Sequence, residues 1–303
     1  MGAIVASLVP VFALIVLGHG LARGRFGGSG FWPGLERLVY YLLYPALLVH
    51  DLARADLGGL NLAALFATCL LAIFAMVPVA LLGAKALRLD GPGFTSLFQG
   101  ATRCNGFVAL AAASALGGAA GLSTMALVIT CMVPAVNFLS VVLLARFGKT
   151  RAGVGATFRG ILSNPLILGC VAGVALNLLG HGLHPLAAET LRILGAAALP
   201  LGLLAVGAGL DFAKARSAGF ATFVGAAAKC LLFPALVVAI AAATGLDGAA
   251  RTNLILFAAM PTAPSAYILA RQLGGDAPLV GAITTLSTLF AVASLPLVIA
   301  WAG

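Results

Sequence analysis

The chain has 303 residues, of which 62% are hydrophobic and 8% are charged, and its mean hydropathy is +1.14. A soluble domain carries about 25% charged residues, so this composition excludes a soluble globular protein. The formal net charge of +9 would suit a nucleic acid or anionic lipid partner, but the basic residues are distributed as the connections of a membrane protein require.

Apolar segments long enough to cross a bilayer, about 20 residues each, follow one another along nearly the whole chain. Proline, glycine and charge clusters separate about ten of them, which run over residues 3–21, 32–52, 61–84, 94–116, 122–146, 154–179, 185–210, 219–244, 249–272 and 278–302. The first has no basic residue ahead of its apolar core, where a signal peptide carries its charge, so we interpret it as a retained helix. The sequence therefore predicts an all-α polytopic membrane protein.

Basic residues are distributed unevenly over the predicted connections. Those after odd-numbered spans, with the adjoining helix ends, hold Arg23, Arg25, Arg37, Lys85, Arg88, Arg146, Lys149, Arg151, Arg159, Lys214, Arg216 and Arg271. The opposite side holds Arg54, Arg192 and Arg251. Because Lys and Arg collect on the cytoplasmic face, we expect both termini on the outer side of a bacterial inner (plasma) membrane. The positive charge then needs no nucleic acid partner.

The cysteines all lie inside apolar runs, at Cys69, Cys104, Cys131, Cys170 and Cys230. This placement favours small buried side chains over disulfides or a metal site. We expect no cofactor. The coupling ion, a proton or sodium, stays open at this stage.

The two halves of the sequence repeat one another at a nearly constant offset. An offset of 155 residues relates Pro10 to Pro165, Arg37 to Arg192, Pro45 to Pro200 and Asp56 to Asp211. Each half holds about five spans, and because five is odd, the second half enters the membrane from the opposite side. We therefore predict two inverted five-helix repeats, residues 1–150 and 151–303, as in many secondary transporters. A duplication kept only for packing is the alternative.

Two spans carry signs of an interruption near their middle. In the ninth, Pro261 and Pro264 stand among small and hydroxyl-bearing residues, and in the fourth, Asn105 falls on Thr262 at an offset of 157 residues. Asn and Thr are good helix N-caps, and Pro264 suits a first helical turn. We expect each span to stop, run extended for a few residues and restart, with the two spans crossing. A proline kink filled by neighbouring helices is the alternative.

Two ionisable side chains, Arg103 and Lys229, fall inside predicted spans, whereas all eight acidic residues lie near span ends or in connections. A charge at bilayer depth costs about 2.5 kcal/mol or more and usually marks a pathway. Half-helix N-termini add N–H donors and positive dipole ends, so we predict an anion site in which Arg103 binds a carboxylate. The candidate substrate-binding residues are Arg103, Asn105, Gly106, Pro261, Thr262, Ser265, Asn137 and Lys229. The alternative is that both cations only bond carbonyl groups freed by the interruptions.

Several segments form recognisable motifs. They are AAMPTAPSAYILARQ over residues 258–272 with the following Gly274-Gly275-Asp276, RCNGF over 103–107, LVYYLLYPALL over 38–48, Asn164-Pro165, and ALPLGLLAVG over 198–207. Together these motifs resemble the auxin efflux carrier family of bacterial permeases. The resemblance implies a ten-helix carrier of the bile-acid/sodium symporter-like superfamily, with interleaved scaffold and transport domains and crossed fourth and ninth helices. It also implies elevator-like alternating access and organic-anion substrates. Departures from the family pattern at Ala109–Ala112 and at Pro264-Ser265 prevent the substrate from being carried over.

We therefore predict a secondary active transporter of a small organic anion, a mono- or dicarboxylate, and not an enzyme. One alternative is a sodium-coupled carrier of the bile-acid symporter type, and a passive channel is another. A membrane-embedded enzyme would need a nucleophile, a base and an orienting group within reach, whereas His19, His50, His181 and His184 lie at span ends. The organic anion and membrane lipid are the expected partners, and a homodimer stays open because Gly-xxx-Gly spacings are common here.

Overall fold

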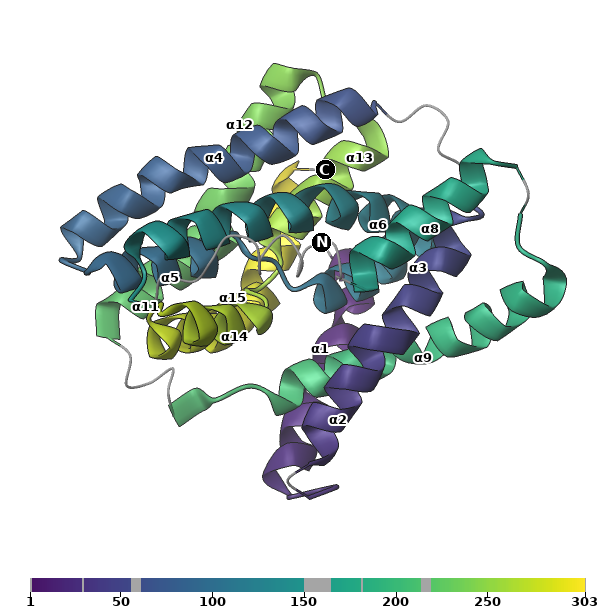
Figure 1. Cartoon of the computed structure of the whole chain (residues 1–303), viewed down its shortest axis with the longest axis horizontal. Coiled ribbons are helices and arrows are strands. Elements are labelled where there is room, and N and C mark those ends of the chain that lie inside the picture. The colour runs from purple at the N-terminus through teal and green to yellow at the C-terminus, as the bar shows by residue number, and fades with distance from the viewer. Residues whose placement is uncertain are drawn as a thin grey trace. The chain divides into compact units, whose positions relative to one another are not determined.

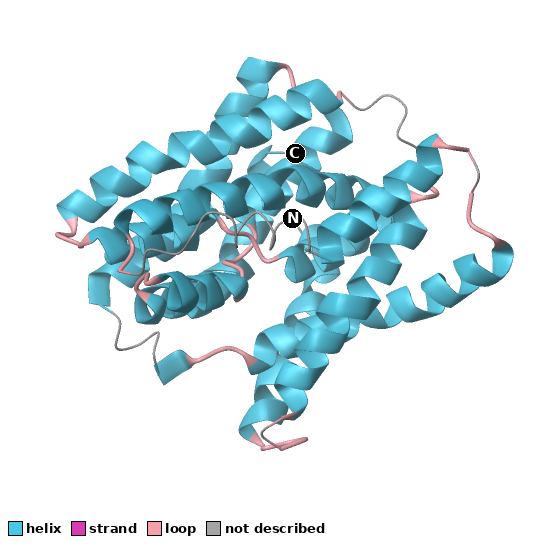
Figure 2. Ribbon diagram, viewed as in Figure 1, coloured by secondary structure: helices cyan, strands magenta, loops and turns pink. Residues whose placement is uncertain are grey.

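The computed structural model describes residues 2–28, 30–55, 61–149, 165–180, 182–213 and 219–302. Within these residues the regular structure is helical throughout, apart from one isolated antiparallel bridge between Cys104 and Thr262 (Figure 2). Six of the described helices are long and apolar enough to cross a bilayer, and they run over Ile4–Arg23, Leu62–Ala86, Gly106–Phe147, Pro185–Ala208, Gly219–Thr244 and Ala277–Trp301. The prediction of an all-α membrane protein is therefore confirmed.

The helices form two compact units, and each unit draws residues from both halves of the chain. The first unit contains described residues within Met1–Leu60, Leu110–Thr130 and Leu162–Leu210. Its helices are α1 (Gly2–Arg23), α2 (Phe31–Leu38), η1 (Val39–Leu43), α3 (Tyr44–Leu52), α8 (Pro165–Leu178) and α9 (Pro185–Ala208). Helix α1 packs against α9, and α3 packs against both α8 and α9 (Figure 1).

Glycine permits the close approach of α1 and α9. A Cβ atom on Gly18 would overlap the backbone of Leu204, and one on Gly207 would overlap the backbone of Ile15. Small residues let helix backbones approach closely where the surroundings are lipid rather than water. The α1–α9 pair is therefore held by backbone-to-backbone packing at these two positions.

The second unit contains described residues within Asn61–Ala109, Cys131–Ile161 and Asp211–Gly303. Its helices are α4 (Leu62–Ala86), α5 (Gly91–Thr102), α11 (Gly219–Ala227), η2 (Ala228–Leu232), α12 (Phe233–Thr244), α13 (Gly248–Ala259), α14 (Ser265–Leu273) and α15 (Ala277–Ala302). Helix α4 packs against α5 and α12, and α15 packs against α5, α11, α13 and α14 (Figure 1).

The helical stretch α6 (Gly106–Phe147) reverses direction at Gly118, which has φ 58° and ψ −145°. Residues eight apart in a straight helix are about 12 Å apart, yet a Cβ atom on Gly121 would stand 2.5 Å from the carbonyl oxygen of Ala113. This left-handed backbone favours glycine. The two arms of α6 thus correspond to the end of the fourth predicted span and to the fifth.

Two wide helical turns precede aromatic–proline pairs. The turn η1 is followed by Tyr44-Pro45 and η2 by Phe233-Pro234, and in each the aromatic residue's N–H reaches the fifth residue before it, Val39 or Ala228. A proline ring clashes with the carbonyl group four residues earlier, and a widened turn relieves that clash. The consequence in η2 is that Lys229 and Cys230, although adjacent, are both fully buried.

Other features of the predicted topology are described only in part. The second predicted span is the continuous run α2–η1–α3, and the ninth is the pair α13 and α14. The part of the sixth span before Pro165, including Asn164, lies outside the described residues, as do Asp56, His181 and the basic residues Arg151, Arg159, Lys214 and Arg216. The inverted repeat and its boundary near residue 150 stay predictions.

Candidate functional site

Two helix interruptions in the second unit pair with each other through their backbones. Helix α5 ends at Thr102 and α6 begins at Gly106, while α13 ends at Ala259 and α14 begins at Ser265. Between them, Cys104 and Thr262 form the antiparallel bridge. The Asn105 N–H donates to the Pro261 carbonyl at 2.8 Å, and the Ala263 N–H donates to the Arg103 carbonyl at 3.0 Å.

This pairing explains how helices can break inside so apolar a chain. Arg103, Asn105 and Met260 adopt extended φ/ψ angles, so their peptide groups leave the helical ladder. Unbonded peptide groups are costly where water is scarce, and irregular backbone is tolerated only where protein or a cavity satisfies it. Each interruption here bonds one peptide N–H of the other, and neighbouring side chains bond further groups. The interruptions predicted from the sequence are therefore present, and they cross.

The Arg103 side chain extends from the first interruption to two other helices. Its Nη1 atom donates to Asn137 Oδ1 at 2.6 Å, and its Nη2 atom donates to Ser265 Oγ at 3.1 Å. The side chain of Arg103 is 8% exposed, Asn137 is half-buried and Ser265 is exposed. Arg103, in the interruption itself, thus brings together two other predicted site residues, Asn137 of α6 and Ser265 of α14, by bonding both.

The two restarting helices differ in how they begin. Asn105 is the N-cap of α6, and its Oδ1 atom accepts hydrogen bonds from the N–H groups of Phe107 and Val108 at 3.0 and 3.3 Å. Pro264 is the N-cap of α14, with no side-chain cap hydrogen bond. The prediction for Asn105 is confirmed. The prediction that Thr262 caps its helix is wrong, because α14 begins at Ser265 and Thr262 is engaged in the crossing.

Thr262 instead bonds a carbonyl near the C-terminal end of α5. Its Oγ1 atom donates to the Gly100 carbonyl at 2.6 Å and accepts from Ser287 Oγ at 3.2 Å, while its N–H donates to the same Ser287 oxygen at 3.0 Å. The last four carbonyls of a helix have no intrahelical donor, so this fully buried hydroxyl satisfies one of them. The hydroxyl and the N–H of Thr262 are thus both bonded to other groups of the protein.

Lys229 reaches the same crossing from η2. Its Nζ atom donates to the Ala258 carbonyl at 2.6 Å and to Cys104 Sγ at 3.1 Å, and it lies 4.8 Å from the centroid of the Phe233 ring. The residue is fully buried. Lys229 therefore contacts the end of α13 and the first interruption, on atoms that belong to the protein itself.

The electrostatics of the crossing follow from four helix ends and two cations. The N-termini of α6 and α14 are positive and the C-termini of α5 and α13 are negative, each by about half an elementary charge. These contributions oppose one another. The sequence-based prediction considered only the positive N-terminal ends and not the negative C-terminal ends beside them. The positive character of the site therefore depends on Arg103, beside the start of α14, and on Lys229, beside the end of α13.

Several residues of the site were not singled out from the sequence. Ser287 connects α15 to the crossing, Gly100 supplies the carbonyl that Thr262 bonds, and Cys104 accepts from Lys229 as well as donating to the Thr102 carbonyl at 3.4 Å. A usable signal existed for Ser287, because the run TTLST over residues 284–288 is unusually polar for an apolar span. Gln99 and Thr102, which flank the first interruption, bond back to their own helix at Thr95 and Phe98.

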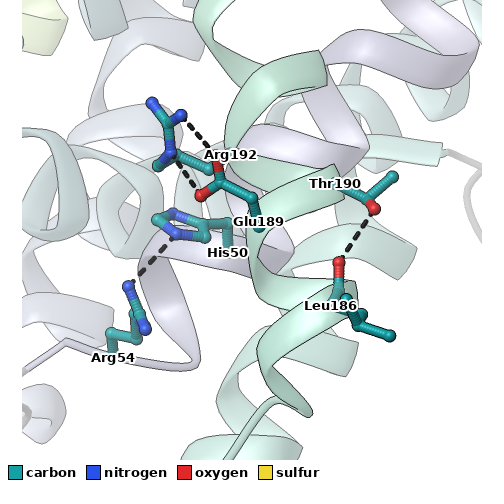
Figure 3. A network of polar contacts seen from close by, with 6 residues as sticks. All are labelled: His50, Arg54, Leu186, Glu189, Thr190 and Arg192. Carbon is teal, nitrogen blue, oxygen red and sulfur yellow. Dashed lines mark hydrogen bonds and ion pairs between the residues drawn. The ribbon is translucent and has the colours of Figure 1, made fainter.

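A second group of polar contacts lies in the first unit (Figure 3). One contact links His50 of α3 to Arg54, which follows that helix, and another links Glu189 to Arg192 within α9. Arg54 Nη1 lies 3.4 Å from His50 Nε2, and Arg192 bonds both carboxylate oxygens of Glu189 at 2.6 and 2.8 Å. The Arg192 and Glu189 side chains are 55% and 56% exposed. Exposed ion pairs contribute little to stability, so this network is a weaker site candidate than the buried crossing.

Comparison with known proteins indicates membrane transport. Residues 149–299 match the family described as membrane transport protein. The chain is also 28% identical over 294 residues, covering 96% of both chains, to a protein of Methanothermobacter thermautotrophicus described as an uncharacterized transporter. The protein is thus a membrane transport protein. These matches agree with the resemblance of the sequence motifs to the auxin efflux carrier family.

Proposed function

We propose that this protein is a secondary active transporter of a small organic anion, a mono- or dicarboxylate, bound where the two interrupted helices cross. The observation that carries this proposal is the position of Arg103. Its guanidinium group lies beside the first residue of α14, bonded to the neutral oxygens of Asn137 and Ser265. A carboxylate there would meet a planar fork of charged donors and the positive end of a helix that no side chain caps.

The eight predicted site residues divide into two groups within this proposal. Arg103, Asn137 and Ser265 contact the anion directly, because their polar groups meet beside the start of α14. The others hold the crossing in shape: Asn105 and Gly106 start α6, Pro261 accepts from Asn105, and Thr262 and Lys229 bond the ends of α5 and α13. None of them provides a nucleophile beside a base, as an enzyme would require.

The transport cycle we propose is elevator-like alternating access by two inverted five-helix repeats in ten spans. Three observations support it. The interruptions occur at equivalent positions of the two halves, α6 doubles back at Gly118 into two arms, and each compact unit combines segments from both halves. Discontinuous helices that meet at a repeat interface are a common form of substrate site in such carriers. The excess of basic residues after odd-numbered spans supports termini outside the inner membrane.

Uptake by the reconstituted protein tests the proposal. Proteoliposomes are assayed for saturable uptake of labelled mono- and dicarboxylates, after a thermal-shift screen of the same compounds has chosen the panel. A charge-assisted hydrogen bond contributes about 1.5–3 kcal/mol, so Arg103→Gln is expected to weaken carboxylate binding by roughly 10- to 150-fold. Arg271→Gln is the matched control, because Arg271 lies on α14 and is exposed, and it should leave uptake unchanged.

Two results would contradict the proposal. One is the absence of saturable uptake of any carboxylate by wild-type protein that unfolds cooperatively. The other is Arg103→Gln protein with wild-type uptake and affinity. Replacing sodium with choline in the same assay distinguishes a sodium-coupled carrier, whose uptake would then stop.

A further inference from the structure

Lys229 is placed where the negative end of an interrupted helix needs a cation. We propose that its ammonium group is a tethered cation that permanently occupies the position beside the end of α13, so that the crossing requires no sodium ion there. The inference deepens the proposed transport function by naming its ion requirement, and it rests on that function only for its bearing on coupling. Its geometry stands independently.

The position of the ammonium group follows from the local sequence. The wide turn η2, which precedes Phe233-Pro234, buries Lys229 completely. Nζ then donates at 2.6 Å to the carbonyl of Ala258, the penultimate residue of α13. That carbonyl would bond the N–H of Thr262 if the helix continued, but this N–H donates to Ser287 instead. The ammonium group therefore replaces the hydrogen bond that the interruption removes.

A cation is expected at such a position on electrostatic grounds. The C-terminal end of a helix carries about half a negative charge, and a nearby cation is stabilised there. In transporters with discontinuous helices, unwound carbonyls and the C-terminal ends of half-helices coordinate the coupling sodium ion or proton. The end of α13 belongs to this class of position, and Lys229 already bonds it.

The groups around Nζ suit an ammonium ion better than a sodium ion. They are one carbonyl oxygen, the sulfur of Cys104 at 3.1 Å and the face of the Phe233 ring at 4.8 Å. Hard metal cations are held by several oxygen ligands, whereas a thiol is a soft one. An ammonium group carries three donors and is also attracted to an aromatic face. All of its contacts here are of kinds that it makes well.

The end of α5 provides an internal comparison. Its Gly100 carbonyl is bonded by the neutral hydroxyl of Thr262 at 2.6 Å. In both helices that end at the crossing, a carbonyl near the C-terminus thus accepts a hydrogen bond from a side chain of the protein. The donor is a hydroxyl group for α5 and an ammonium group for α13. Of these two donors, only Lys229 carries a charge, and it bonds the end of α13.

Thermal unfolding of the purified full-length protein tests the inference without any substrate. Wild-type protein is heated in sodium, potassium and choline chloride at equal ionic strength, and its Tm is expected to agree within about 1 °C among them. Lys229→Ala is expected to lower the Tm by about 5 °C or more. Methylammonium chloride, which can enter the vacated position, should restore a large part of that loss, and the bulkier tetramethylammonium chloride should not.

Lys85→Ala is the control, because Lys85 is an exposed lysine in the last turn of α4, and methylammonium should not change its Tm. A saturable rise of the wild-type Tm with sodium would overturn the inference. So would a Lys229→Ala protein that keeps the wild-type Tm, or one that methylammonium fails to rescue. If Lys229→Ala does not fold, Lys229→Met and the wild-type sodium titration decide the matter. Failure to find carboxylate uptake leaves these outcomes unaffected.

Discussion

Replacing Thr262 with valine tests the hydroxyl group that joins the second interruption to α5 and α15. The substitution removes the hydrogen bond donated to Gly100 at 2.6 Å and the one accepted from Ser287 at 3.2 Å. A hydrogen bond contributes about 0.5–1.5 kcal/mol net, and a buried acceptor left unbonded costs about 1–3 kcal/mol. Because Thr262 is fully buried, we expect a loss of about 2–4 kcal/mol in the free energy of unfolding.

The assay is thermal unfolding of the purified protein. Binding of the mono- and dicarboxylates chosen by the thermal-shift screen is then measured on the folded fraction. For a chain of 303 residues, a loss of this size corresponds to a fall in Tm of about 3–6 °C, whereas Thr262→Ser, which keeps the hydroxyl, should lower the Tm much less. Thr288→Val is the matched control, because Thr288 is also buried on α15 and its hydroxyl donates within its own helix, to the Thr284 carbonyl at 2.8 Å. If Thr262→Val keeps the wild-type Tm, or loses no more than Thr288→Val, the structural role assigned to Thr262 is refuted.

Two further substitutions test other parts of the fold by the same thermal measurement. Asn105→Ala removes the N-cap of α6 and should lower the free energy of unfolding by about 0.5–2 kcal/mol. Asn105→Asp keeps the accepting oxygen and should lower it less. Equal losses in the two variants would argue against capping as the role of Asn105. Gly207→Val places a side chain against the backbone of Ile15 and should lower the Tm strongly. Gly2→Val, at a position with open space around it, should not. A Gly207→Val protein with the wild-type Tm would contradict the packing of α1 on α9.

The interruptions could be predicted from sequence because their signals are local. Two prolines near Thr262, and Asn105 in an otherwise apolar span, identify where a helix cannot continue and where another begins. The exact start of α14 was not predictable in the same way. Thr262 and Pro264 both suit a helix start. The hydroxyl group of Thr262 instead donates a hydrogen bond to the carbonyl of Gly100, which is 162 residues away along the chain. Such competition is decided by tertiary contact and not by residue type.

The roles of the two buried cations show the same limit. The sequence placed Arg103 and Lys229 at depth, but it could not show that Arg103 faces Asn137 and Ser265 while Lys229 faces Ala258. The direction of Lys229 depends on the wide turn before Pro234, which shifts the helical register locally. Counting residues at a regular spacing of 3.6 per turn assigns the wrong face after such a turn.

The bonding of the two interruptions to each other also fixes their lengths. Asn105 and Arg103 bond Pro261 and Ala263 in an antiparallel register, so one residue inserted beside Cys104 would displace both bonds at once and turn the next side chain to the opposite face. An insertion or deletion in one segment is therefore tolerated only with a compensating change in the other. Segments encoded far apart in the gene are in this way constrained to change together.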